Sequence, residues 1–163
     1  MVIVVTFLII IVVLIIFLAL SIVYSNKERF EKISFKESMD LTGFPIVTFY
    51  IGEKKLNFIL DTGSNVSYIN KDCLSDIPYK KINKTTYVTG FQADEEPKPF
   101  AYFEFYYKEH KFEDEFCIVD LSTSFGQIKQ QSGVTLHGLL GSKFFQKYRY
   151  VINFDELIAY SKR

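Results

Sequence analysis

The sequence predicts an all-β domain with one short C-terminal helix, preceded by a transmembrane helix at the N-terminus. Three observations lead to this prediction. Residues 1–24 are almost entirely apolar, several short runs between residues 46 and 154 are rich in β-branched and aromatic side chains, and a single helix signal lies at residues 142–147. The part that follows the apolar segment has about the length of one domain.

Residues 1–24 form the predicted membrane anchor. A helix of this length would measure about 36 Å, enough to cross a hydrocarbon core of about 30 Å. The alternative is a cleavable signal peptide, with Ala19-Leu20-Ser21 supplying the small residues for cleavage. However, no Lys or Arg precedes the apolar run, and the run is longer than a signal peptide normally requires. The anchor is therefore preferred, and cleavage stays open.

The charges beside the anchor predict its orientation. The basic residues that closely follow it are Lys27, Arg29, Lys32 and Lys36, and nothing basic but the amino terminus precedes it. The positive-inside rule then places the C-terminal domain on the cytoplasmic side of a single-pass membrane protein, with an exported domain as the alternative. Residues 25–43 are interpreted as a juxtamembrane tether and residues 44–163 as the folded domain. Within the tether, residues 25–42 are expected either to be helical or to lead straight into the domain.

The expected strands begin just after Phe44. Residues 46–51 and 56–60 alternate in the manner of strands and form a hairpin around the turn at residues 52–55. Further strands are expected at residues 66–70, 85–92, 100–107, 111–119 and 150–154. The acidic, proline-containing residues 94–99 read as an exposed loop. The helix at residues 142–147 is expected to use Ser142 as its N-cap.

The first functional motif is Asp61-Thr62-Gly63-Ser64, which follows the apolar strand Phe58-Ile59-Leu60. A carboxylate at the end of an apolar strand is costly unless it is paired, neutralised or used. Gly63 would let backbone amides approach the carboxylate, and we expect the Ser64 hydroxyl to steady Asp61. A solvated turn at the end of a strand is the alternative, and this motif alone does not distinguish the two.

A second motif, His137-Gly138-Leu139-Leu140-Gly141-Ser142-Lys143-Phe144-Phe145, combines an apolar strand, two glycines and a helix start. Another strand follows it at residues 150–155. The two motifs together resemble the retropepsin-like (retroviral-type) aspartic proteases, and the resemblance covers roughly residues 46–160. It implies a single-lobe acid protease barrel and an aspartic endopeptidase that needs neither cofactor nor metal.

The resemblance also implies roles for individual residues. Asp61 would be the catalytic acid, Thr62 would contact a partner subunit, Gly63 would allow close approach, and Ser64 would support the site. The second motif would supply the structural residues Gly138, Leu140 and Gly141. The substrate-binding flap is expected at Thr89, Gly90 and Phe91, with residues 94–99 forming its tip or lying beyond it.

Only one Asp-Thr-Gly occurs in the chain, whereas aspartic proteases need two carboxylates that share one proton. The expected solution is a homodimer with both copies of Asp61 on its two-fold axis, acting on a peptide or protein substrate. The sequence therefore predicts a membrane-anchored aspartic endopeptidase. The alternatives are a non-catalytic dimerisation or peptide-binding module of the same fold, and an anchored β-domain with a fortuitous motif.

The remaining residues mainly exclude other functions. The net charge is zero and no basic stripe is visible, which argues against nucleic acid as a partner. Cys73 and Cys117 have no metal-site spacing, and either buried thiols or one disulfide would fit them. His137 is expected to be a packing or surface residue rather than a base or ligand.

Overall fold

The computed structural model describes residues 10–18, 32–87 and 96–161. The chain divides into two units, Met1–Glu31 with Arg163, and Lys32–Lys162. In the first unit, residues 10–18 are helical and exposed, and the rest of the predicted anchor lies outside the described residues. Within the ranges that the structure describes, no helix combines the length and the apolar character needed to cross a membrane.

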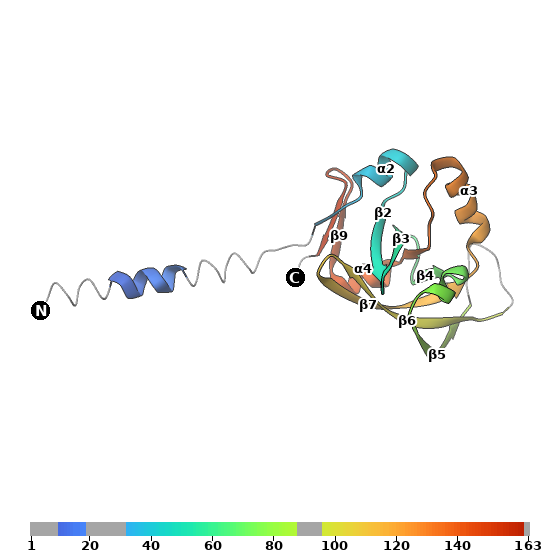
Figure 1. Ribbon diagram of the computed structural model, residues 1–163, viewed down its shortest axis with the longest axis horizontal. Helices are drawn as coiled ribbons and strands as arrows, with labels where there is room; N and C mark the ends of the chain where they lie inside the picture. The colour runs from blue at the N-terminus through green and yellow to red at the C-terminus, as the bar shows by residue number, and fades with distance from the viewer. Residues whose placement is uncertain (1–9, 19–31, 88–95, 162–163) are drawn as a thin grey trace, which may run out of the picture. The chain divides into compact units, whose positions relative to one another are not determined.

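The second unit is mainly β-structure, as predicted, and Figure 1 shows its arrangement. Its strands are β1 (Lys32–Ser34), β2 (Ile46–Ile51), β3 (Lys54–Leu60), β4 (Ser67–Asn70), β5 (Lys80–Thr86), β6 (Lys98–Tyr107), β7 (His110–Val119), β8 (Gly138–Leu140), β9 (Tyr150–Asn153) and β10 (Ile158–Ser161). Its helices are α2 (Lys36–Thr42), the 3-10 helix η1 (Lys71–Asp76), α3 (Ser122–Ser132) and α4 (Ser142–Tyr148). Seven strands form one sheet in the order β2-β3-β8-β4-β7-β6-β5, with an additional β2–β6 pairing, and β1-β10-β9 form a second sheet.

The centre of the large sheet explains why the two sequence motifs meet. β3 pairs in parallel with β8, placing Leu60 opposite Leu140, and β8 pairs with β4 on its other side. Every residue of β8 is buried. A strand covered on both faces is apolar throughout, which is why Gly138-Leu139-Leu140 carries no polar side chain.

The core of the domain is largely aromatic. Phe49, Phe58 and Phe105 are fully buried, and the Phe49 and Phe105 rings pack edge to face with 5.1 Å between their centroids. The core continues through Phe112 and Phe144, whose centroids lie 5.8 Å apart. Such aromatic pairs add to the hydrophobic stabilisation of the sheet. Because Phe144 belongs to α4, the same core fixes this helix against the sheet.

The folded domain begins at Lys32, earlier than the predicted boundary at residue 44. β1 pairs with β10, and Ile33 and Phe35 are 2% and 1% exposed. Residues 32–43 are therefore not a tether. The sequence prediction was wrong here because the two buried apolar residues stand in a charged stretch, and because β1 is too short to show alternation.

α3 was not predicted, whereas α2 lies within residues 25–42, for which a helix was one of the two alternatives. α3 is polar and contains Gly126 in its interior, so its helix propensity is weak. Its available signals were the spacing of Leu121, Phe125 and Ile128, which face one cluster of the core, and the C-cap Gly133 with φ of 77°. The start of the strand predicted at residues 85–92 belongs to β5, which runs from Lys80 to Thr86, and residues 88–92 lie outside the described residues.

Candidate active site

Asp61 leaves the sheet directly after β3. Its backbone N–H donates to the Leu140 carbonyl at 2.9 Å, so the end of β8 holds the start of the Asp61 turn. The Gly63 N–H donates to Asp61 Oδ1, also at 2.9 Å, and the Ser64 N–H donates to the Asp61 carbonyl at 3.4 Å. These bonds orient a partly exposed carboxylate at the end of a buried strand. A carboxylate held in this way can accept a proton from a bound water.

The other residues of the motif differ in exposure and contacts. Thr62 and Gly63 are exposed, which leaves Thr62 accessible to a second copy of the chain. Ser64 is half-buried, and its hydroxyl donates to the Val66 carbonyl at 2.8 Å. The expectation that Ser64 would steady the Asp61 carboxylate is therefore wrong. Ser64 instead stabilises its own turn, because its hydroxyl reaches a carbonyl two residues further on.

Ser142 connects the two sequence motifs. Its hydroxyl donates to the carbonyls of Thr62 at 2.9 Å and Ser64 at 2.8 Å. Its backbone N–H also donates to the Ser64 carbonyl, at 2.7 Å. The N-cap of α4 is Gly141, and no side chain caps this helix. The predicted N-cap role of Ser142 is thus wrong, because its hydroxyl bonds across to the Asp61 turn rather than to its own helix.

The two glycines of the second motif lie in very close contact with β4 and the residue before it. A Cβ on Gly138 would lie 2.3 Å from the Tyr68 carbonyl oxygen, and a Cβ on Gly141 would lie 2.4 Å from that of Val66. Real Cβ atoms do not approach backbone oxygens so closely. Leu140, between them, is fully buried. This packing brings β8 against the back of the Asp61 turn.

His137 takes part in packing just before β8. Its ring Nδ1 accepts a hydrogen bond from the Asn57 backbone N–H at 3.0 Å, and its backbone N–H donates to the Asn57 carbonyl at 2.9 Å. Its carbonyl accepts from the Asn70 N–H at 2.8 Å. Burial lowers the pKa of His137, and Lys129 lowers it further. The neutral imidazole therefore bonds to β3, and the backbone of His137 connects β3 and β4 just before β8.

The lowered pKa of His137 predicts a pH dependence of stability. Below about pH 6.5 the unfolded chain binds a proton at this histidine more readily than the folded chain does. The free energy of unfolding therefore decreases as the pH is lowered. A His137→Asn variant should lack this part of the loss, because Asn Oδ1 can accept from the Asn57 N–H without titrating. Denaturant unfolding at about pH 7.5 and about pH 5 measures it, with His110→Asn as the control. An equal loss in wild type and His137→Asn would contradict the prediction.

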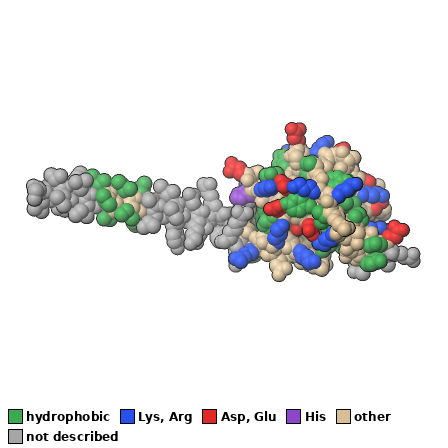
Figure 2. Space-filling model, turned by 90° about the horizontal axis from the view of Figure 1, so that it is seen from below, with side chains coloured by type: hydrophobic (Ala, Val, Ile, Leu, Met, Phe, Trp, Pro, Cys, Tyr) green, Lys and Arg blue, Asp and Glu red, His purple; other side chains and the backbone are tan. Residues whose placement is uncertain are grey.

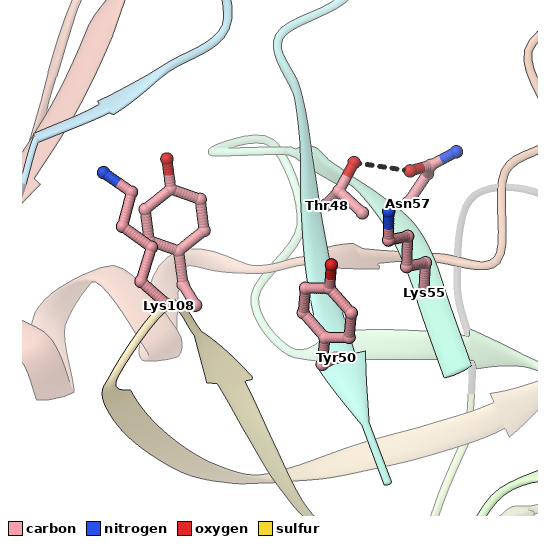
Figure 3. A pocket seen from close by; sticks show the side chains of 6 residues that line it. Thr48, Tyr50, Lys55, Asn57 and Lys108 are labelled. Atoms are coloured by element: carbon pink, nitrogen blue, oxygen red, sulfur yellow. Dashed lines mark hydrogen bonds between the residues drawn. The ribbon is translucent and has the colours of Figure 1, made fainter. Parts of the chain in front are cut away.

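The predicted flap residues Thr89, Gly90 and Phe91 lie outside the described residues. The strands on either side of them, β5 and β6, pair as a hairpin with Thr86 opposite Lys98. A separate groove of ≈ 570 Å³ lies at the opposite end of β3 from Asp61. Figure 3 shows the side chains that line it, which are Thr48, Tyr50, Lys55, Asn57, Tyr107 and Lys108.

The charged and thiol groups give little sign of other chemistry. Cys73 and Cys117 are free thiols, and burial raises the pKa of each to about 11, so neither is a thiolate at neutral pH. Among the described ranges, no cluster of three His, Cys, Asp or Glu side chains could hold a metal ion. On the face drawn in Figure 2, basic side chains lie among acidic and apolar ones. Lys111 and Glu104 form an ion pair at 2.8 Å.

Comparison with known proteins identifies similar solved structures only. No family model matches the sequence, and no curated protein matches it. The EIAV protease complexed with the inhibitor HBY-793 is similar to this chain at 16% identity, covering 64% of this chain and 86% of that one, with a TM-score of 0.40. A retropepsin-like aspartic protease from Rickettsia conorii is similar at 15% identity, covering 81% and 90% respectively, with a TM-score of 0.48.

Proposed function

We propose that this chain is an aspartic endopeptidase, active as a homodimer in which the Asp61 side chain of each copy contributes to one catalytic dyad. The observation that carries the proposal is the way the Asp61 turn is held. Leu140 accepts from the Asp61 N–H, and Ser142 bonds to the carbonyls of Thr62 and Ser64. A solvated turn at a strand end needs no such support from a segment 80 residues away. A carboxylate that performs chemistry does need it.

The proposed reaction uses two carboxylates that share one proton, because two such charges side by side cannot both ionise easily. The ionised Asp61 takes a proton from water while the water oxygen bonds to the scissile carbonyl carbon. The protonated Asp61 of the other copy donates its proton to the carbonyl oxygen as that oxygen gains charge. The tetrahedral intermediate then collapses and the C–N bond breaks, as the first Asp61 gives the proton it took from water to the leaving nitrogen. The second Asp61 takes back the hydroxyl proton as the C=O bond forms again, so the dyad ends with its one shared proton. The Gly63 N–H keeps Asp61 Oδ1 in place meanwhile.

The dimer follows from the number of carboxylates. The sequence contains one Asp-Thr-Gly, so one chain provides half of the dyad. A two-fold axis beside Asp61 would bring the second carboxylate into place, with the same surface used by both copies. Thr62 is exposed next to Asp61, where the partner copy would meet it.

The homodimer predicts how activity depends on concentration. Across the range in which the full-length protein dissociates, the rate of peptide-library cleavage should rise with about the square of protomer concentration and become linear above it. Cleavage rate and molecular mass, measured on the same dilution series, test this. A strictly linear rate across the dissociation range would show that one chain alone carries the site.

We also propose that residues 1–24 anchor this enzyme in a membrane with residues 32–162 on the cytoplasmic side. The support is the apolar run and the basic residues that follow it. Two copies anchored in one membrane have a raised effective concentration, which favours the dimer. Recovery of the full-length protein in the soluble fraction of lysed cells would contradict this placement.

A further inference from the structure

A chain of hydrogen bonds lies behind the Asp61 turn and connects three distant segments. The Gly141 N–H donates to Ser67 Oγ at 3.3 Å, and the Ser67 hydroxyl donates to Asp114 Oδ2 at 2.9 Å. Ser67, the first residue of β4, is 1% exposed. Asp114 lies on β7 and is half-buried. These hydrogen bonds therefore connect a carboxylate on β7 to the glycine that precedes α4.

Gly141 is the residue through which these hydrogen bonds reach the proposed site. Its neighbour Leu140 accepts the hydrogen bond from the Asp61 N–H, and its other neighbour, Ser142, bonds to the Asp61 turn. Gly141 also lies so close to the backbone of Val66 that a Cβ atom would not fit between them. A shift of Gly141 would therefore displace the backbone on both sides of Asp61.

We propose that Asp114, acting through Ser67, is a positioning residue for the catalytic carboxylate of Asp61, an inference that rests on the proposed peptidase function. An ionised carboxylate can only accept hydrogen bonds, so the Ser67 hydroxyl must donate to it. The lone pairs of Ser67 Oγ are then directed to the Gly141 N–H. A partner that could also donate would leave the orientation of Ser67, and with it Gly141, undetermined.

The carboxylate at position 114 is costly for the fold, which favours a role beyond packing. Burial raises the pKa of Asp114, and the nearby charge of Glu115 raises it further. The hydrogen bonds from Ser67 and the Glu115 backbone, together with the charge of Lys147 on α4, act in the opposite direction and favour the ionised form. A serine or threonine at position 114 would satisfy Ser67 without a buried charge, but it could donate as well as accept.

The test compares two variants of the full-length protein, Ser67→Ala and Asp114→Asn. The first removes the hydroxyl, and the second replaces an acceptor with an amide of the same shape that both donates and accepts. Each should lower kcat by roughly 10-fold with KM within about two-fold of wild type, because a misplaced catalytic group slows the chemical step. The double variant should lose about as much as either single one, because both act through one chain.

The matched control is the pair formed by Ser122 and Asp72, where the Ser122 hydroxyl donates to Asp72 Oδ2 at 2.7 Å without contact to Gly141. Ser122→Ala and Asp72→Asn should leave kcat unchanged. Residue-resolved hydrogen exchange of the Asp61 and Gly141 amides provides a readout that needs no activity. Both amides should exchange roughly 10-fold faster in Ser67→Ala and Asp114→Asn, and at the wild-type rate in the controls.

The outcomes separate the two proposals. If the wild type cleaves peptides and the Ser67 and Asp114 variants keep its kcat, or change KM alone, the inference is wrong and the peptidase stands. If the wild type cleaves nothing, the peptidase proposal fails, and unchanged exchange at Asp61 and Gly141 would then overturn the positioning role as well. Slower chemistry together with faster exchange at both amides supports the inference, and Asp114→Asn keeps the test decisive should Ser67→Ala not fold.

Discussion

An Asp61→Asn variant is expected to lose peptide hydrolysis by roughly 10³-fold or more while remaining a folded dimer. An amide can neither take a proton from water nor donate one as an acid, and both copies in the dimer lose the group together. Removing a general acid or base costs about 10²- to 10⁴-fold, and removal of both members of a dyad belongs at the upper end of that range. The rate constant kcat, thermal unfolding and molecular mass are the measurements.

The fold should survive this change because the asparagine can make the same turn. Its Oδ1 can accept from the Gly63 N–H as the aspartate does at 2.9 Å. The chain already contains such a turn at Asn153, whose Oδ1 accepts from the Asp155 N–H at 2.9 Å. The expected loss of activity is therefore chemical and should appear without loss of stability.

A matched control and a mixing experiment sharpen the interpretation. Asp120 Oδ1 accepts from the Ser122 N–H at 3.0 Å in the same kind of turn, so Asp120→Asn makes the same substitution away from the site and should keep activity. Adding an excess of the Asp61→Asn chain to wild type should inhibit it, because mixed dimers have one Asp61. Excess Asp120→Asn should not inhibit. Full activity of Asp61→Asn in a preparation free of contaminating peptidase would refute the assignment.

The sequence predicted the parts of the fold whose patterns are local. The hairpin of β2 and β3 was predicted because its buried and exposed residues alternate, and its observed strands, Ile46–Ile51 and Lys54–Leu60, confirm it. The strand at Gly138–Leu140 and the helix α4 were predicted because an apolar run, glycines and a helix start follow in order. These elements contain the residues of both motifs.

The sequence did not predict features that depend on distant partners. β1 exists because β10 pairs with it, and neither strand was expected. The predicted hydrogen-bond partners of Ser64 and Ser142 were wrong. A hydroxyl can bond to its own turn or across to another segment, and the folded backbone determines which of the two it does. The bond from Ser67 to Asp114 joins positions 47 residues apart and left no pattern in the sequence.

A Gly141→Ala variant should be destabilised by about 3 kcal/mol or more and should lose peptidase activity. The reason is steric, since the φ of −91° and ψ of 176° at Gly141 suit any residue. The added Cβ would lie 2.4 Å from the Val66 oxygen and 2.5 Å from its carbonyl carbon, both backbone atoms. The clash can be relieved only if the backbone at Val66 or at Gly141 moves, and Ser64 and Ser142 connect these segments to the Asp61 turn.

Denaturant unfolding of wild type and variant gives the change in the free energy of unfolding. Gly126→Ala is the matched control, because a Cβ there meets nothing within 4 Å and the residue lies inside α3. Alanine should stabilise that helix by up to about 1 kcal/mol, so the same substitution is expected to have opposite effects at the two glycines. If Gly141→Ala proved as stable and active as wild type, the close contact between Gly141 and Val66 could not be what holds the Asp61 turn. The turn would then be supported by the hydrogen bonds of Leu140 and Ser142 alone.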